Sequence, residues 1–268
     1  AVPLLAAGGD GAVETTATLV RGFDAQCRFG TPGVVRDGWN PYGASHRLIN
    51  LLAGLALCRA GGKEPSPEAE QEILEHVRLC AVFVGRNLER DVGYNHLMKN
   101  LTALAVYAAA CPGDSIAPEF IRPLDHDLPE LIGRCVLADG FHAERSPMYH
   151  LLALFDVLAL RDCAGTGSGR EMLNSAAPAR TEALGTRTHP AGDIALFNDS
   201  WLGEAPRASA RIAAGRGAES VTRLPDAGYV RLGGGDSGDA LLFDSGPCGP
   251  DDNPAHAHGD FLSIEVSV

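Results

Sequence analysis

The residues from Asp139 to His150 (DGFHAERSPMYH) combine a helix start with side chains that can exchange protons. Ser146 followed by Pro147 is typical of an N-cap and a first helical position, and an apolar run follows. Tyr149 then falls in the first turn, where the helix dipole should lower the pKa of the phenol from its usual value of about 10. The sequence predicts either a tyrosine that can serve as a proton acceptor or an aromatic that only packs at a helix N-terminus.

Two further polar clusters contain candidate residues. In YNHLMKN, His96 and Asn100 are four residues apart on a predicted helix and share a face, with Asn95 beside them. An Asn-His pair at a helix start is more often a cap than a catalyst. In PAHAHGD, His256 and His258 point the same way if the segment is extended. They can be two metal ligands, or one catalytic residue beside one ligand.

Helical periodicity dominates the first part of the chain. The pattern predicts a mixed helical region at 12–30 and helices at 46–57 (N-cap Ser45), 67–88 (N-cap Ser66), from Asn95 onward, 118–137 and 147–163. The stretch 164–192 is rich in Gly, Ala, Pro and Thr and should interrupt this pattern, and a short helix can follow at 205–214.

From residue 226 the period changes to that of strands, which we expect at 229–232, 240–244 and 261–268. The fold class is therefore α+β, with an all-α part at 1–163, a linking segment at 164–225 and a sheet at 226–268. The last strand alternates apolar and polar residues up to the final one, which leaves an edge and an apolar face without partners. We expect the native polypeptide to continue beyond this fragment.

Composition narrows the classes of function. A net charge of −12 argues against nucleic acid as a partner and requires a local basic pocket for any anionic ligand. No run of eighteen apolar residues is present, so no membrane span is expected. Seven cysteines without CxxC spacing are interpreted as buried thiols. The first residues lack both Met and a basic region, which indicates a processed or trimmed chain. Separately, we expect a periplasmic or extracellular location, with a cytoplasmic one as the alternative.

Several short motifs follow one another between about residues 36 and 268. They are WNPYxxSxRxxN at 39–50, NHxxxN at 95–100, ExSPxYH at 144–150, NDS at 198–200, GY at 228–229, DxGP at 244–247 and HAHGDxLS at 256–263. In this order, the set resembles the heparinase II/III family of polysaccharide lyases. The resemblance implies an incomplete α/α toroid followed by the start of an antiparallel β-sandwich, truncated here, with a glycan cleft between toroid and sandwich.

The resemblance also implies a reaction, β-elimination on a uronic acid. The enzyme neutralises the sugar carboxylate, removes the proton on C5 with a base and protonates the departing O4. The implied partner is an anionic polysaccharide or oligosaccharide. A heparan-type glycosaminoglycan, an alginate-like uronate and a bacterial capsular polysaccharide all remain open, and the low lysine content and negative charge favour a less charged polymer.

By resemblance, the catalytic set is Asn95, His96, Tyr149 and His256. Asn95 would hydrogen-bond the carboxylate, and His96 would be the base or a second neutralising group. Tyr149 would be the acid, or both acid and base, while His256 would bind the acidic group or tune Tyr149. The substrate-binding set is Arg47, Trp39, Tyr42, Asn100 and Glu144. For Trp39 and Tyr42 burial is an alternative, and Glu144 and Asp199 can instead orient histidines.

A metal is not required for elimination. His258 resembles the position that ligates a structural zinc in some members of the family, and the rest of such a shell would lie past Val268. A structural zinc is therefore expected, if at all, only in the full-length protein.

Three other functions remain open. A metal-dependent hydrolase would use His256 and His258 as ligands and a metal-bound water as nucleophile. A toroidal glycoside hydrolase would need two carboxylates, for instance Asp139 and Glu144. A glycan-binding protein without catalysis would not need the Tyr149 hydroxyl.

Overall fold

The computed structural model describes residues 11–163, 168–205, 221–233 and 238–268 of the chain. Internal contacts divide the chain into two compact units, Ala1–His126 and Asp127–Val268, and each is described by itself. The division into 1–163, 164–225 and 226–268 stays a prediction.

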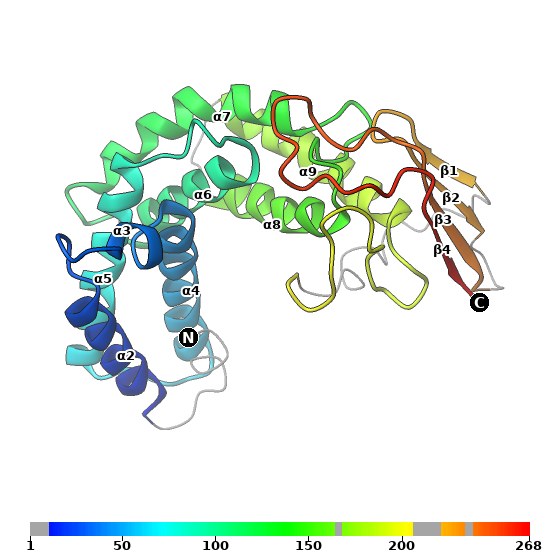
Figure 1. Ribbon diagram of the computed structural model, residues 1–268. Coiled ribbons are helices and arrows are strands. Elements are labelled where there is room, and N and C mark those ends of the chain that lie inside the picture. Colours follow the sequence, from blue (N-terminus) through cyan, green and yellow to red (C-terminus); the bar gives the residue numbers. More distant parts are fainter. Residues whose placement is uncertain (1–10, 164–167, 206–220, 234–237) are drawn as a thin grey trace. The chain divides into compact units, whose positions relative to one another are not determined.

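The first unit is helical. Its elements are α2 (Ala12–Gln26), α3 (Val34–Asp37), α4 (Pro41–Ala60), α5 (Pro67–Arg86), α6 (Tyr94–Ala110), the 3-10 helix η1 (Ala117–Phe120) and the first turns of α7 (Ile121–Cys135). α4 packs against both α5 and α6, as Figure 1 shows. Leu48 and Leu55 of α4, Ile73 and Val77 of α5 and Leu104 of α6 lie in one buried apolar cluster. The apolar stripes read from the sequence therefore face a common core.

Two helix starts in this unit test the capping signals. Ser66 caps α5 as predicted, and its hydroxyl accepts the N–H of Ala69 at 3.4 Å. The prediction that Ser45 caps the helix at 46–57 is wrong. α4 begins five residues earlier, where the Asn40 side chain accepts the N–H of Gly43 at 2.6 Å. Proline at the first helical position reinforces this earlier start.

The second unit adds two long helices and a sheet. α8 (Pro147–Cys163) begins and ends where predicted. α9 (Ser168–Thr186) occupies a stretch that was predicted to interrupt the helices, so that prediction is wrong. α9 packs against α8, and its Leu184 is buried with Leu151 and Leu154. Apolar burial here outweighs the poor helix propensity of Gly and Pro. The short helix suggested at 205–214 lies almost entirely outside the described residues.

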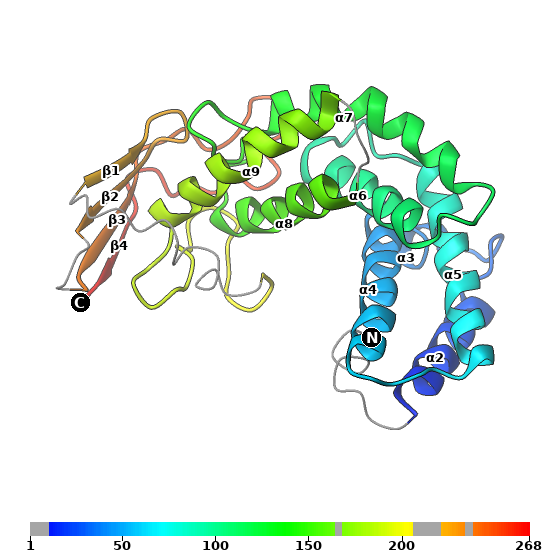
Figure 2. The same ribbon diagram turned by 180° about the vertical axis from the view of Figure 1, so that it is seen from behind.

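The sheet has four antiparallel strands in the order β1-β2-β3-β4, and Figure 2 shows them side by side. They are β1 (Val221–Leu224), β2 (Tyr229–Gly233), β3 (Ala240–Asp244) and β4 (Ile264–Ser267). β2 and β3 were predicted, β4 is shorter than predicted, and β1 was missed. The α+β class, helices followed by an antiparallel sheet, is confirmed. Leu224, Tyr229 and Leu242 are buried with Phe141 and Phe197 from the preceding chain.

Two predictions from composition can be compared with the structure. Cys58, Cys80 and Cys135 are buried, but Cys248 is exposed, so the interpretation of all seven cysteines as buried thiols is wrong for Cys248. Within the described part of the chain, no helix is both long enough and apolar enough to cross a membrane.

We expect Asn40→Ala to lower the free energy of unfolding by about 1 kcal/mol, because α4 loses its N-cap hydrogen bond. The measurement is urea unfolding followed by circular dichroism. Asn50→Ala is the matched control, since Asn50 is exposed in the middle of the same helix. An equal loss in both variants would contradict the capping role.

Candidate active site

The predicted site residues fall into two clusters, one in each unit. The His96 cluster, in the first unit, consists of Tyr42, Glu89, Asn95, His96 and Asn100. The His256 cluster, in the second unit, consists of Glu144, Tyr149, Asp199, Asn253 and His256. Each was found partly by sequence reasoning, and each contains a residue that this reasoning missed.

Glu89 organises the His96 cluster. One carboxylate oxygen lies 3.0 Å from Nδ1 of His96, and the other accepts a hydrogen bond from Nδ2 of Asn100 at 3.0 Å. The Asn100 oxygen in turn accepts the backbone N–H of Glu89 at 2.9 Å, and Nδ2 also donates to the Ser45 hydroxyl at 3.2 Å. Asn100 is fully buried. Its amide therefore anchors Glu89, and the substrate contact expected of Asn100 stays a prediction.

The His96 imidazole remains partly exposed, with 33% of its side chain accessible. Its ring stacks on Tyr42 with centroids 4.4 Å apart, and Tyr42 meets His46 edge-on. If Nδ1 carries the proton donated to Glu89, the lone pair on Nε2 can accept a proton. Burial, with the charges of Lys99 and His96, lowers the pKa of His46 to about 4, so His46 is neutral near pH 7.

Asn95 is buried, yet neither atom of its amide has a hydrogen-bond partner among the described residues. A buried amide without partners costs on the order of 1–3 kcal/mol, so such groups usually have a role. The free amide can donate Nδ2–H to a carboxylate. The contact with a substrate carboxylate that the resemblance implied for Asn95 stays a prediction.

Two residues of the predicted substrate-binding set lie elsewhere in the first unit. Trp39 is 1% exposed and its indole N–H donates to the carbonyl of Cys27 at 2.7 Å. A buried ring cannot stack on a sugar, so Trp39 belongs to the core. The Arg47 guanidinium lies over Phe23 and Trp39, at 4.4 and 5.1 Å from the ring centroids. These aromatic contacts hold Arg47, and its contact with a substrate charge stays a prediction.

The His256 cluster is built on the start of α8. Ser146 and Ser200 share a hydrogen bond of 2.8 Å between their hydroxyls, and the Ser200 hydroxyl accepts the N–H of Met148 at 3.1 Å. Tyr149 lies in this first turn, as predicted, and its ring stacks on His256 with centroids 3.7 Å apart. The helix start thus fixes the tyrosine against the histidine.

His256 is held mainly by Asp199. Nδ1 of His256 lies 2.9 Å from a carboxylate oxygen of Asp199, and the backbone N–H of Asp199 donates to the carbonyl of His256 at 3.2 Å. The neighbouring Asn198 accepts the backbone N–H of His258 at 3.0 Å and donates to the Tyr229 hydroxyl at 3.2 Å. These contacts tie the segment 254–260 to residues 198 and 199.

This segment is not extended. A turn covers Ala255 and His256, and the Asp260 carboxylate accepts the N–H of Asn198. The expectation that His256 and His258 share one strand face is therefore wrong, because loop hydrogen bonds replace strand pairing. In the described parts of the chain no three His, Cys, Asp or Glu side chains are grouped to hold a metal ion. The residues around His258 do not fit a zinc site, and zinc stays a prediction for the full-length protein.

Burial dominates the electrostatics of Tyr149. It raises the pKa of the phenol to about 12, and the charges of Asp199, Glu144 and Glu204 act in the same direction. The predicted lowering by the helix dipole is wrong, because desolvation and nearby carboxylates outweigh it. Tyr149 is therefore a protonated phenol near pH 7 and can donate a proton.

Glu144 is buried next to His256, and only 1% of it is exposed. Burial raises the pKa of its carboxyl to about 8, although the charge of Arg180 acts against this. One oxygen accepts a hydrogen bond from Nδ2 of Asn253 at 3.1 Å and lies 3.8 Å from Nε2 of His256. Such burial does not suit direct binding of substrate, so Glu144 fits the alternative role of orienting a histidine.

The carboxylate pair of the glycoside hydrolase alternative is not supported. One oxygen of Asp139 accepts the N–H of Phe141 at 3.1 Å, and the other accepts the N–H groups of Asp226 and Ala227 at 2.8 Å each. Asp139 therefore holds backbone turns, and its oxygens are not free to act beside Glu144 on a glycosidic bond.

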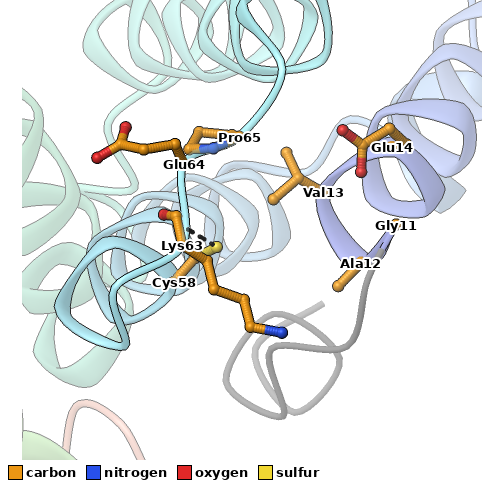
Figure 3. Close-up of a pocket in the computed structure, with 8 residues that line it drawn as sticks. All are labelled: Gly11, Ala12, Val13, Glu14, Cys58, Lys63, Glu64 and Pro65. Carbon is orange, nitrogen blue, oxygen red and sulfur yellow. Dashed lines mark hydrogen bonds between the residues drawn. The ribbon is translucent and has the colours of Figure 1, made fainter.

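A cavity of about 330 Å³ lies elsewhere in the first unit, between the start of α2 and the loop after α4 (Figure 3). Its lining residues are Gly11, Ala12, Val13, Glu14, Cys58, Lys63, Glu64 and Pro65. None belongs to the His96 cluster, and charges of both signs face the cavity. This cavity is therefore separate from the candidate catalytic residues.

Sequence reasoning missed Glu89 and Asn253. Glu89 lies in the loop before α6, seven residues from His96. The two residues meet only because of the conformation of this loop, which the sequence pattern does not reveal. Asn253 lies 109 positions after Glu144 in the chain. A long-range pair of this kind has no local signal.

Comparisons with known proteins bear on the family and on the fold. Residues 216–268 match a family model described as Heparinase II/III-like, C-terminal. No curated protein matches the chain. The fold resembles a crystal structure of heparinase III with a TM-score of 0.73 at 17% identity, covering 97% of this chain and 46% of that one. For the heparan sulfate lyase HepC from Pedobacter heparinus, the TM-score is 0.62 at 17% identity, covering 98% and 44%.

The chain thus has the helical and β-sheet fold found in solved heparinase III structures. The resemblance to the heparinase II/III family that the motifs predicted is confirmed. The chain spans less than half the length of the solved structures that it resembles.

We expect the stability of the protein to fall with rising pH because of Glu144. Its pKa is raised in the folded state, to about 8, so the folded protein keeps a proton that the unfolded chain releases near pH 4.5. Stability from this group is complete below that pH and is lost as the pH approaches 8, with a slope of at most about 1.4 kcal/mol per pH unit. Urea unfolding between pH 5 and 8 should show this slope, and Glu144→Gln should remove it. Equal slopes in both proteins would contradict the assignment.

Proposed function

We propose that the protein containing this chain is a polysaccharide lyase that cleaves a uronic-acid-containing polysaccharide by β-elimination. The observation that carries the proposal is that one group can accept a proton and another can donate one. His96, with Nδ1 against Glu89, has a nitrogen that can accept a proton, and Tyr149 is a phenol that can donate one. Elimination needs one group of each kind.

The base half of the reaction is assigned to the His96 cluster. The C5 proton of a uronate is a weak acid, and neutralising the adjacent carboxylate makes it easier to remove. The unpartnered amide of Asn95 can donate to that carboxylate. Nε2 of His96 takes the proton as the C5–H bond breaks, and Glu89 stabilises the imidazolium that forms.

The acid half is assigned to Tyr149. As the C4=C5 double bond forms, the bond from C4 to O4 breaks, and O4 takes the phenolic proton. His256 stacks on the phenol and stays fixed by Asp199, so that it holds the acid in place and can also contact the substrate carboxylate. No step requires a metal.

A heparan-type glycosaminoglycan is the first substrate to test, because the solved structures of similar fold are titled heparinase III and heparan sulfate lyase. The chain itself has a net charge of −12 and only two lysines. These features favour a weakly sulfated uronate polymer over a heavily sulfated one. We also propose a periplasmic or extracellular location, where such polymers occur.

The test is ultraviolet absorbance of the conjugated C4=C5 product, with the full gene product and a panel of uronate polysaccharides. We expect absorbance to grow on at least one polymer and Tyr149→Phe to reduce kcat by about 100- to 10,000-fold, because only the proton donor is lost. Tyr107→Phe is the matched control, since its hydroxyl contacts Asp114 away from both clusters. Reducing ends without unsaturated product would indicate a hydrolase instead. No product of either kind would indicate a glycan-binding role.

Glu89→Gln tests the base half separately. The amide oxygen can still accept from His96, while the amide NH2 faces Nδ2 of Asn100, so the variant removes the charge together with one hydrogen bond. We expect kcat to fall by about 10- to 100-fold with little change in KM. Glu119→Gln, at an exposed position of the same unit, should leave both constants unchanged. A loss of equal size in the two variants would contradict the role of Glu89.

A further inference from the structure

The imidazole of His256 has a neighbour at each nitrogen and on one face. Asp199 lies 2.9 Å from Nδ1, and a carboxyl oxygen of Glu144 lies 3.8 Å from Nε2. The Tyr149 ring covers the face at 3.7 Å. The contact with Glu144 is too long for a hydrogen bond, but such contacts at active sites often shorten when substrate binds.

The position of Glu144 is determined by contacts on several sides. Its carboxyl oxygen accepts from Asn253, and its backbone N–H donates to Nδ1 of His142 at 3.2 Å. The backbone N–H of His142 donates to Nδ1 of His150 at 3.0 Å, and Nε2 of His150 donates to the carbonyl of Arg180 at 2.8 Å. His142 and His150 are fully buried.

This chain of contacts returns to the helix turn from which it starts. His150 follows Tyr149 directly in α8. One helix turn therefore contributes both the phenol that stacks on His256 and the imidazole that, through His142, holds the backbone of Glu144. The ring of His150 makes its hydrogen bonds to His142 and Arg180, so it has a supporting position. Tyr149, His256 and Glu144 are therefore fixed relative to one another by a closed set of contacts within the second unit.

The titratable and charged groups around Glu144 come from several elements. They are Cys135 of α7, His142 in its own segment, Tyr149 of α8, Arg180 of α9 and His256 with its partner Asp199. Burial acts against ionisation of the Glu144 carboxyl, and the Arg180 charge favours it. The second carboxyl oxygen is buried and has no hydrogen-bond partner among the residues that the structure describes.

We propose that Glu144 is a positioning residue for the elimination reaction: as a neutral carboxylic acid it donates to Nε2 of His256 and, opposite Asp199, fixes the imidazole against the Tyr149 ring. This inference rests on the proposed function. In the neutral imidazole, Nδ1–H donates to Asp199 and Nε2 accepts from Glu144, so both ring nitrogens are satisfied at once. The acid proton of Tyr149 is then delivered from a fixed position.

The test compares Glu144→Ala and Glu144→Gln in the full gene product. We expect Glu144→Ala to lower kcat at least tenfold with KM changed less than twofold. Glu144→Gln should restore most of kcat near pH 7, because an amide at this place can donate to His256 while Asn253 flips to present its oxygen. Glu171→Gln, at an exposed position in α9, is the matched control and should behave as the unaltered protein.

The pH profile separates positioning from a merely structural role. Above pH 8 the Glu144 carboxyl ionises and can no longer donate, so kcat of the unaltered protein should fall on the alkaline side. Glu144→Gln should lack this fall. An unchanged kcat in Glu144→Ala, or the same alkaline fall in Glu144→Gln, would overturn the proposal.

A measurement without turnover keeps this inference distinct from the proposed function. Nitrogen-15 NMR of the His256 imidazole should show the tautomer protonated at Nδ1 in the unaltered protein and in Glu144→Gln at pH 7. Glu144→Ala should show a mixture of tautomers and a weaker ring-current shift from Tyr149. If no polymer yields unsaturated product, this spectrum still decides whether Glu144 positions His256. Identical spectra in all three proteins would overturn it.

Discussion

The hydrogen bond between Asp199 and His256 is the contact on which the second cluster depends. It connects two segments 57 positions apart in the chain, and each residue of the Asn198-Asp199-Ser200 motif makes a different connection. Asn198 holds the loop that contains His258, Asp199 holds the His256 ring, and Ser200 caps the first turn of α8. Asn198 has a φ of 52°, a conformation that asparagine adopts more readily than most residues. This motif therefore gives Tyr149 and His256 a common support.

Burial is the leading cause of the large pKa shifts of Tyr149 and Glu144 in the His256 cluster and of His46 beside the His96 cluster. It raises the pKa of Tyr149 and Glu144 and lowers that of His46. All three shifts favour the neutral form of the side chain near pH 7. The carboxyl groups of Glu89 and Asp199 each lie against the Nδ1 atom of a histidine.

The two clusters hold their histidines in the same way but differ in what surrounds them. In each, a carboxylate holds Nδ1 of a histidine and an aromatic ring stacks on its face, Tyr42 for His96 and Tyr149 for His256. The difference lies at Nε2. At His256 it faces the buried carboxyl of Glu144. The His96 ring is one-third exposed and stands beside the unpartnered amide of Asn95. This contrast is why we assign proton removal to His96 and a supporting role to His256.

Local sequence determined the features that depend on neighbouring residues. Ser146-Pro147 fixed the start of α8 and hence the place of Tyr149, and short strand-like runs after residue 226 located β2 and β3. Ordered motifs were enough to predict the family resemblance and to select Tyr149, His96 and His256. Only the tertiary structure decided which side chains are supports. Glu89 and Asn253 reach their partners through loop conformation, Trp39 is taken up by the core, and apolar packing makes α9 a helix despite its glycines and proline. The direction of the Tyr149 pKa shift was also decided by the tertiary structure. The helix dipole can be inferred from the local sequence, but desolvation and the carboxylates of distant residues cannot.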